Sequence, residues 1–525
     1  MRRPTIPSLA ALAVVVLAVG TLLAACSTAT GAPSTEARIV MGAPSTLDPA
    51  ATGDAGSAAV IAQLFEPLTA FDDERRLQPA LAESWRLEED GRRIVFQLRP
   101  DLTFSDGTPL VASDVVRSWL RLIDPAAPSP LVTLMFDVVG AREYLAGGSL
   151  DDVGLVADDD AGTVTVDLVR PAADFPTIVA SPSFAVVPPG IDDDPAVITP
   201  GDGFVASGGY RLTDVAATTM RFEANDRYWA GTPALTGIDA VTDLEGRSPV
   251  EAFEDGEIDY APINGADADW IAYDATLGPQ LREVGSLATD YYGFDTTAAP
   301  FDDVRVRQAF GAAVDWRRIG HLALDDPEDV ATSMVPPGIP GRSDRDVVPL
   351  YDPDLARSLL ADAGYPGGAG FPQVTIQSGG SPYDDAVIAQ LKSVLGIDVE
   401  AEYMDFDAYF ERLDTDAPQM WFLSWVADYP GRNDFLGVLL GTESVNNYGR
   451  WSSEEFDAAI ADAGSAGDEA AAGAAYDRAE DLVQRDVPVV PMSYGTGWAL
   501  SRDGLLGAGQ NGLGNLRLAG MAWAD

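Results

Sequence analysis

The chain has 525 residues, of which 46% are hydrophobic and 9% aromatic, so it is long enough to bury two or three cores and too apolar to be disordered. Aspartate and glutamate total 82 against 33 lysines and arginines, and the resulting net charge of −49 would repel a phosphate backbone and argues against nucleic-acid binding. We interpret the acidity as solvation of the surface rather than as a means of capturing cations.

Residues 1–25 are typical of a secretory signal peptide. They carry two arginines near the start and an apolar run over 9–23 that is short for a membrane span. The run ends in LAAC, which resembles a lipobox, so we predict that Cys26 receives a diacylglyceryl group and becomes the new N-terminus. Two acyl chains anchor a protein stably where one does not. Residues 26–37 are small and polar, which predicts a flexible tether.

The next part of the chain shows strand and hairpin signals. A strand near Arg38 precedes an apolar helix that passes through Ile61. Hairpin arms at 84–89 and 93–99 flank an Asp-Gly turn, and the apolar residues of the second arm alternate toward one face. The same alternation around Val166 indicates a further strand. These patterns predict an antiparallel sheet.

Turn and cap residues mark the helix boundaries in this half. A turn at 105–107 is followed by Ser113 and Asp114, either of which could begin a helix. The Pro-rich and acidic stretch 181–203 is interpreted as a loop that returns to the first lobe. Further along, a helix is predicted to end at Gly256, with a short strand after it.

The segment 291–315 is predicted to be a crossing between two lobes that is followed directly by a helix. Asp302 or Asp303 can accept hydrogen bonds from the first free backbone N–H groups, and Val306 and Phe310 stand at helical spacing. The helix is therefore expected to be amphipathic.

The cysteine and histidine counts exclude several kinds of catalysis. Any Ser-His-Asp or Cys-His mechanism would need the single histidine, His321, which we predict to be a surface or half-buried residue of a helix. One cysteine and one histidine cannot build a zinc site, and the sequence has no G-x-x-x-x-G-K-[ST] loop. Two carboxylates could serve a glycosidase, but with 82 acids such pairs are expected by chance. We therefore expect no enzyme, no cofactor and no metal site.

Strand and helix signals alternate in the second lobe. A strand at 374–377, a helix at about 383–395 and a strand at 397–403 follow one another. Two strands joined by a helix in this way form a βαβ unit, because a parallel pair needs a long crossover. This lobe is therefore predicted to be α/β.

Helix caps and a late strand complete the pattern. Asp352 is predicted to begin a helix that stops at Gly364. Ser452 and Glu455 have the spacing of a capping box. The apolar run at 488–494 is predicted to be a buried strand that leads back toward the first lobe.

Several phrases of the sequence resemble, in order, the signatures of a known family. They are TLDP, FQLRPDLTFSDGTPLVASDVVRSW, GGYRL, NDRYWAG, EAFEDGEIDYAPI and PFDDVRVRQAFGAAVD. The family is bacterial solute-binding protein family 5, the extracellular proteins that feed oligopeptide and dipeptide ABC importers. The resemblance covers essentially the whole mature chain, and one departure is Gly209, which stands where relatives usually have proline.

The resemblance implies an α/β fold of the type II periplasmic-binding-protein-like class. Two α/β lobes are joined by a hinge and close around the ligand, and the first lobe carries an additional domain. The implied division is 38–64, 182–289 and 492–525 for the discontinuous lobe I, 65–181 for the extra domain, and 290–491 for lobe II.

The resemblance also implies where a ligand would sit. In MWFLSWVADYP, Trp425 and Asp428 match a family pattern whose acid pairs with the α-ammonium of the ligand. The neighbouring backbone, at Ser424 and Val426, would pair with a peptide as an added strand. The residues alone would also fit a plain core strand followed by a turn.

Two tyrosines and several departures complete the implied site. Tyr291 and Tyr494 correspond to ligand-facing tyrosines in similar proteins, though each could equally belong to the core. Leu413 and Phe422 occupy places where some close relatives carry arginines that help to hold a peptide carboxylate, and residues 430–432 replace an acid or a proline pair. The amine end of a peptide is therefore better supported than its carboxylate end.

We therefore predict a lipid-anchored substrate-binding protein of an ABC importer, which captures peptides outside the membrane and delivers them to the permease. Its partners would be a peptide or another small solute, the permease and ATPase subunits, and the membrane, and the protein would be a monomer. It would lie on the outer face of the cell membrane, or in the periplasm if the source has an outer membrane. Alternatives are the same role for a disaccharide, an opine or a metal chelate, a lipoprotein receptor that passes a signal, and a secreted carbohydrate-active enzyme with two carboxylates.

Overall fold

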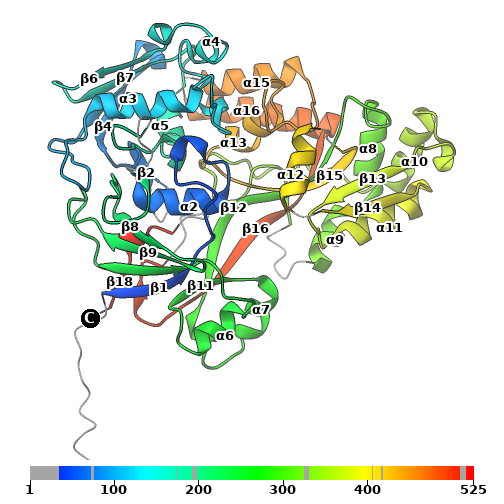
Figure 1. Cartoon of the computed structure of the whole chain (residues 1–525). Helices are drawn as coiled ribbons and strands as arrows, with labels where there is room; N and C mark the ends of the chain where they lie inside the picture. The colour runs from blue at the N-terminus through cyan, green and yellow to red at the C-terminus, as the bar shows by residue number, and fades with distance from the viewer. Residues whose placement is uncertain are drawn as a thin grey trace, which may run out of the picture.

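The structure is a computed structural model. It describes residues 35–72, 76–172, 174–191, 198–323, 330–404, 406–415, 418–466, 468–508 and 516–524. The predicted signal peptide and Cys26 lie outside these ranges. Within them, no helix is both long enough and apolar enough to cross a membrane. Figure 1 shows a mostly blue and green part beside a mostly yellow and orange part, with long strands running between them.

A ten-stranded sheet runs through both parts, in the order β14-β13-β15-β12-β16-β11-β1-β10-β9-β8. Its two central strands, β12 (Leu281–Phe294) and β16 (Val489–Ser501), are long and pair antiparallel. The C-terminal part of β16 also pairs with β11 (Tyr260–Ile263), and the C-terminal part of β12 also pairs with β15 (Met420–Val426). These two strands therefore join the halves of the sheet (Figure 1), and the strand predicted at 488–494 lies in β16.

The half of the sheet beyond β16 is mixed. β1 pairs parallel with β10, and β8 and β9 form an antiparallel hairpin. Ile61 of α2 is fully buried in one core with Ile39 and Phe222 of the sheet, and Gly256 follows the end of α6 as predicted. The elements are β1 (Glu36–Val40), α2 (Ala55–Leu64), β8 (Tyr210–Val215), β9 (Thr219–Ala224), β10 (Gly237–Val241), α6 (Pro249–Glu254), β11 (Tyr260–Ile263) and α7 (Gly265–Ile271).

The other half of the sheet contains the predicted βαβ unit. β13 (Val374–Ser378) and β14 (Val399–Tyr403) pair parallel and are connected by α11 (Asp384–Leu395). Gly396 ends the helix with φ +73°, a conformation that glycine adopts without strain. Asp352 caps α10 (Pro353–Asp362), with its Oδ1 accepting from Leu355 N at 3.0 Å, as predicted.

A separate four-stranded antiparallel sheet confirms the predicted hairpin. Its order is β4-β5-β7-β6, and it comprises β4 (Ala82–Glu88), β5 (Arg93–Leu98), β6 (Leu155–Asp158) and β7 (Thr163–Asp167). Phe96 points from β5 into the core, where it meets Trp119 of α3 (Ala112–Leu120) edge to face, with ring centroids 6.1 Å apart. Both side chains are fully buried, so the sheet and α3 share a core.

Two predicted helix starts are corrected by the structure. α3 (Ala112–Leu120) begins one residue before Ser113, and Asp114 is inside the helix, where its Oδ2 accepts from Val111 N at 3.0 Å. α15 (Glu454–Gly464) is capped by Ser453 rather than Ser452. The cap is the residue whose extended backbone aims its oxygen at the first free N–H groups, and adjacent polar residues look alike in sequence.

The remaining elements include the helix predicted after the crossing. α8 (Val304–Ala313) has Asp303 as its cap, one of the two predicted candidates, and His321 is exposed on α9. The others are β2 (Thr69–Phe71), β3 (Leu77–Pro79), α4 (Ala141–Leu145), α5 (Phe175–Ile178), α9 (Trp316–Ala323), α12 (Phe406–Thr415), β15 (Met420–Val426), α13 (Arg432–Phe435), α14 (Gly437–Leu440), α16 (Glu469–Asp486), β17 (Leu505–Leu506) and β18 (Ala522–Trp523), together with short 3-10 turns.

Candidate functional site

One side of β15 is paired with a neighbouring strand over only part of its length. The strand pairs with β12 on one side over its whole length, but with β13 on the other side only at Met420 and Trp421. Beyond Trp421, that second side has no strand partner among the residues that the structure describes. Such an edge presents backbone N–H and C=O groups that an extended chain can pair with.

The backbone at Ser424 and Val426 faces this open edge. Phe422 O accepts from Tyr409 OH at 2.6 Å on that side, whereas Ala427 N donates to Leu287 O at 2.8 Å on the β12 side. Backbone groups of alternate residues point to opposite sides of a strand, so Ser424 and Val426 share the orientation of Phe422. Ser424 is exposed and Val426 is 37% exposed. The structure thus places the backbone of both residues on the open edge, and their pairing with a peptide stays a prediction.

Asp428 lies in the turn that follows β15, and a second acid holds that turn. Asp434, on α13, is fully buried, and its Oδ2 accepts from Trp425 Nε1 at 3.0 Å and from Asp428 N at 3.2 Å. This one oxygen fixes both residues of the predicted ammonium site. Asp434 was not predicted from the sequence; the one local signal is an acid next to the apolar run FLGVLL.

Asp428 and Asp434 each have one carboxyl oxygen without a hydrogen-bond donor in the described part of the chain. Asp428 Oδ2 and Asp434 Oδ1 are both buried and have no hydrogen-bond partner within the described part of the chain. Burial raises the pKa of Asp428 to about 7. Burial, and then the negative charge of Asp428, raise the pKa of Asp434 well above its usual range. The turn is thus an acidic site whose free acceptors suit a cationic donor.

Arg432, the arginine nearest to Asp428 in sequence, forms its ion pairs with other acids. Arg432 is 4% exposed, and its Nη2 donates to Glu480 Oε2 at 2.6 Å and to Asp477 Oδ1 at 2.8 Å, both on α16. Its Nη1 donates to Gly341 O at 3.1 Å. Arg432 therefore clamps α13 to α16 rather than neutralising Asp428. This gives Arg432 a structural role.

The acidic turn lies where the two parts of the molecule meet. Tyr429 is fully buried in one core with Leu68 and Phe175 from the first half of the chain, and Trp425 packs against that core. Nearby, Arg142 of α4 pairs with Glu443, which follows α14, at 2.7 Å. Figure 1 shows α4 near α15, and one cavity is lined by Arg142 of α4 and Ile460 of α15. In this conformation Tyr429 of the turn is therefore packed against residues from the first half of the chain.

The two predicted tyrosines are buried away from the open edge. Tyr291 is 2% exposed within an apolar core. Tyr494 is 5% exposed, and its hydroxyl accepts from Thr332 N at 2.9 Å and from Arg342 Nη2 at 3.0 Å. Both placements fit the core reading, and contact of either tyrosine with a ligand stays a prediction.

Side chains around Ser424 add a second polar group on the sheet. Ser493 Oγ donates to Asp290 Oδ2 at 2.8 Å, and Asp290 stands opposite Ser424 in the register of β12 and β15. Burial raises the pKa of Asp290, and hydrogen bonds from Ser493 and Ser424 oppose the rise. Elsewhere among the described residues, no group of three or more His, Cys, Asp or Glu side chains is arranged to hold a metal ion.

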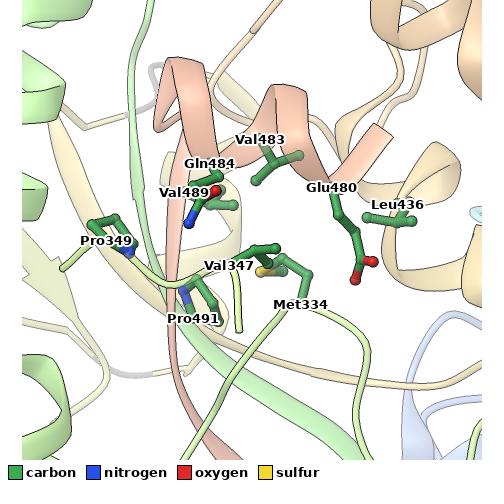
Figure 2. A pocket seen from close by; sticks show the side chains of 9 residues that line it. All are labelled: Met334, Val347, Pro349, Leu436, Glu480, Val483, Gln484, Val489 and Pro491. Carbon is green, nitrogen blue, oxygen red and sulfur yellow. The ribbon is translucent and has the colours of Figure 1, made fainter. Parts of the chain in front are cut away.

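Two cavities lie near this site without including the predicted residues. Figure 2 shows one of about 10 Å³, where Glu480 lies beside Leu436, and it has room for about one water molecule. A larger one, of about 390 Å³, lies between Arg142 on one half and Asn433 on the other. Asn433 Nδ2 donates to Tyr429 OH at 3.0 Å, so the larger cavity adjoins the acidic turn.

Comparison with known proteins places the chain among solute-binding proteins. Residues 76–447 match the family model described as bacterial extracellular solute-binding proteins, family 5 middle. The probable deoxycholate-binding periplasmic protein YgiS of Escherichia coli is 29% identical over 475 residues, which cover 86% of each chain. The dipeptide-binding protein DppE of Bacillus subtilis is 26% identical over 480 residues, covering 88% of this chain and 86% of DppE.

Solved structures share the fold over nearly the whole length. The murein tripeptide binding protein MppA of Escherichia coli superposes with a TM-score of 0.81 at 25% identity, covering 93% of this chain and 98% of MppA. The Haemophilus influenzae OppA complex with the peptide RPPGFSPFR gives a TM-score of 0.79 at 22% identity, with coverage of 94% and 99%. These likenesses confirm the predicted two-lobed fold class of the periplasmic binding proteins.

Proposed function

We propose, because the chain belongs to family 5 of the bacterial extracellular solute-binding proteins, that it captures peptides outside the membrane and delivers them to an ABC permease. A lipid on Cys26 holds it at the outer face of the membrane, with residues 26–37 as a tether. The relatives with solved structures include peptide-binding proteins, which supports a peptide as the cargo. The protein works as a monomer and is not an enzyme.

The observation that carries the proposal is the open edge of β15 with Asp428 at its end. An extended peptide adds to that edge as a strand, pairing with the backbone at Ser424 and Val426, which gives affinity without reading side chains. Its α-ammonium then meets the Asp428 carboxyl in a charge-assisted hydrogen bond. Trp425, which donates a hydrogen bond to Asp434, lines this end of the site. Tyr291 and Tyr494 complete the site when the ligand is bound.

The division into lobes belongs to the same proposal. Lobe I comprises 38–64, 182–289 and 492–525, the extra domain comprises 65–181, and lobe II comprises 290–491. Closure about the strands β12 and β16 brings Tyr429 against the first half of the chain, which encloses the ligand. The permease recognises this closed form.

A non-peptide solute is the second candidate, because one relative is named for binding deoxycholate. Deoxycholate is a carboxylate, and the acidic turn, where one oxygen each of Asp428 and Asp434 has no donor among the described residues, would repel an anion placed beside it. A cationic or uncharged solute remains compatible with the turn. The acids therefore favour an ammonium-bearing ligand over an acidic one.

The purified protein is expected to retain peptides and return them uncut. No nucleophile, metal or phosphate motif was found in the sequence, and the relatives are solute-binding proteins. The measurement is mass spectrometry of a peptide mixture before and after incubation, with the bound fraction released by unfolding. Turnover of peptides or of oligosaccharides would show an enzyme instead, and retention of sugars or chelates alone would favour the second candidate.

Replacing Cys26 by serine is expected to abolish lipid labelling. Cells fed a labelled fatty acid should label the wild-type protein, because the thioether to the lipid requires the cysteine sulfur. Cys26→Ser should be unlabelled and either shed or left unprocessed, whereas Ser27→Ala, the neighbouring change, should be labelled normally. Label that persists in Cys26→Ser would remove the lipid anchor from the proposal.

A further inference from the structure

We propose that Asp434 is a second carboxyl group of the ammonium site, which holds a proton when the site is empty and releases it when a primary ammonium binds between Asp434 and Asp428. This inference rests on the proposed function and adds to it a second acid and a proton. The ligand class is a peptide, or another amine, with an unblocked ammonium group.

The two carboxyl oxygens of Asp434 have different surroundings, and this difference supports the inference. Oδ2 is saturated by Trp425 Nε1 and Asp428 N, whereas Oδ1 is buried without a partner in the described structure. Asp428 Oδ2 is in the same condition. The 3.2 Å bond from Asp428 N to Asp434 holds the two residues side by side. A buried acceptor without a donor is costly, so two at one place are expected to serve a ligand.

In the described part of the chain, the two arginines around the turn form their ion pairs with other carboxylates. Arg432 is bound to Glu480 and Asp477, and Arg170 is bound through two nitrogens to Asp137, at 2.8 and 2.6 Å. The other titratable groups around the turn are Asp174, Tyr429 and Tyr476. Every charge among these three groups would be negative, so they cannot compensate a carboxylate.

Two adjacent buried carboxyls cannot both ionise without a cation, so the empty site keeps a proton. Burial and the charge of Asp428 raise the pKa of Asp434 well above its usual range, in the direction that keeps a proton on Asp434, whose Oδ1 has no partner in the described structure. An arriving ammonium donates N–H to Asp428 Oδ2 and Asp434 Oδ1, the O–H bond of the carboxylic acid breaks, and the proton leaves to solvent. No other bond changes.

The sign of the pH dependence follows from this exchange. The empty protein and free ligand together hold more protons than the complex, so affinity rises with pH while the pair is still protonated. It falls again above about pH 8, where an α-ammonium loses its own proton. A site with Asp428 alone would show a smaller rise, because Asp434 would contribute no proton.

Asp434→Asn separates the two roles of this residue. Its amide oxygen can still accept from Trp425 Nε1 and Asp428 N, while its NH₂ group replaces the free oxygen by a donor that opposes an ammonium. Trialanine should therefore bind at least about tenfold more weakly than to wild type. N-Acetyltrialanine, which has no ammonium, should bind the two proteins equally. Asp462→Asn, an acid 67% exposed on the same half, is the matched control and should change neither.

Proton release gives a readout that a purely structural residue would not move. Calorimetry in two buffers of different ionisation enthalpy should show that wild type releases about one proton more than Asp434→Asn on binding trialanine at pH 7. Infrared spectra of the peptide-free proteins should show stronger carboxylic-acid C=O absorption at pH 7 in wild type than in Asp434→Asn. If the variant does not fold, the inference is tested by measuring the affinity of wild type for trialanine at several pH values, and the affinity should rise with pH.

Each outcome decides the inference. Equal trialanine affinity or equal proton release in wild type and Asp434→Asn overturns it while leaving peptide capture intact, and so does equal carboxylic-acid absorption in the two proteins. A wild type that shows the stronger absorption but binds no trialanine overturns the ammonium assignment. Failure to retain any peptide from a mixture overturns the proposed function itself, which is a separate measurement.

Discussion

Asp428→Asn is expected to lower the affinity for a free peptide by about 2–5 kcal/mol, which at about 1.4 kcal/mol per decade is at least tenfold. The change keeps the shape of the side chain but removes the negative charge that faces the ligand ammonium. Asp428 Oδ2 has no hydrogen-bond partner in the described part of the chain, so this oxygen is available to a donor of the ligand. Titration calorimetry measures the loss directly.

Acetylating the peptide provides the second side of the same test. N-Acetylation removes the ammonium, so it should weaken binding to wild type about as much as Asp428→Asn does, and should add little in the variant. Only a direct pair makes the two changes non-additive, whereas a misfolded variant would bind every peptide poorly. Asp398→Asn, an acid 71% exposed and paired with Lys392, should leave the affinity unchanged.

Some results would remove Asp428 from the site. Full affinity of wild type for acetylated peptides would mean that the carboxyl does not meet an ammonium. A preference for an uncharged sugar over any peptide would mean that Asp428 is structural and that the cargo belongs to another class. Additive effects of the substitution and the acetyl group would also contradict a direct pair.

Strands and helices that are determined by a short run of residues can be predicted from the sequence. The hairpin of β4 and β5 follows from alternation of apolar residues around an Asp-Gly turn, and the parallel pair of β13 and β14 follows from the helix between them. The errors lie where neighbours compete for one role, as at Ser452 and Ser453. Which of two adjacent hydroxyls caps a helix depends on the backbone path, and packing sets that path.

The same distinction holds for the candidate site: residues within one short run of sequence could be predicted, and residues placed by distant contacts could not. The family pattern marks Asp428 and Trp425 because they lie in one short run of sequence. Asp434 could not be found like this, since its role depends on α13 returning beside the turn that it holds. The burial of Tyr291 and Tyr494 depends on long-range packing of β12 and β16, which no local pattern reports.

Arg432→Met is expected to lower the free energy of unfolding by about 3–5 kcal/mol. Arg432 and Glu480 are both almost fully buried, at 4% and 2% exposed, and removing one partner leaves a buried carboxylate without compensation. Urea unfolding followed by circular dichroism measures the change. Glu480 already has its pKa raised by burial, and the loss of the arginine should raise it further. A raised acid pKa costs stability where the acid is ionised, so the defect should shrink as the pH falls from 7 to 5.

Two further variants separate the buried pair from a general effect of losing an arginine. Arg478→Met, on the same helix as Glu480, breaks an exposed pair with Asp462 and should cost less than about 1 kcal/mol. Adding Glu480→Leu to Arg432→Met should restore most of the loss, since an apolar pair of similar volume avoids the uncompensated charge. A loss below 1 kcal/mol for Arg432→Met, or no recovery in the double variant, would show that α13 is not held to α16 by this ion pair. Asp434 would then be positioned by the packing of Phe435 and Leu436, which are buried in the same apolar core as Val483 of α16.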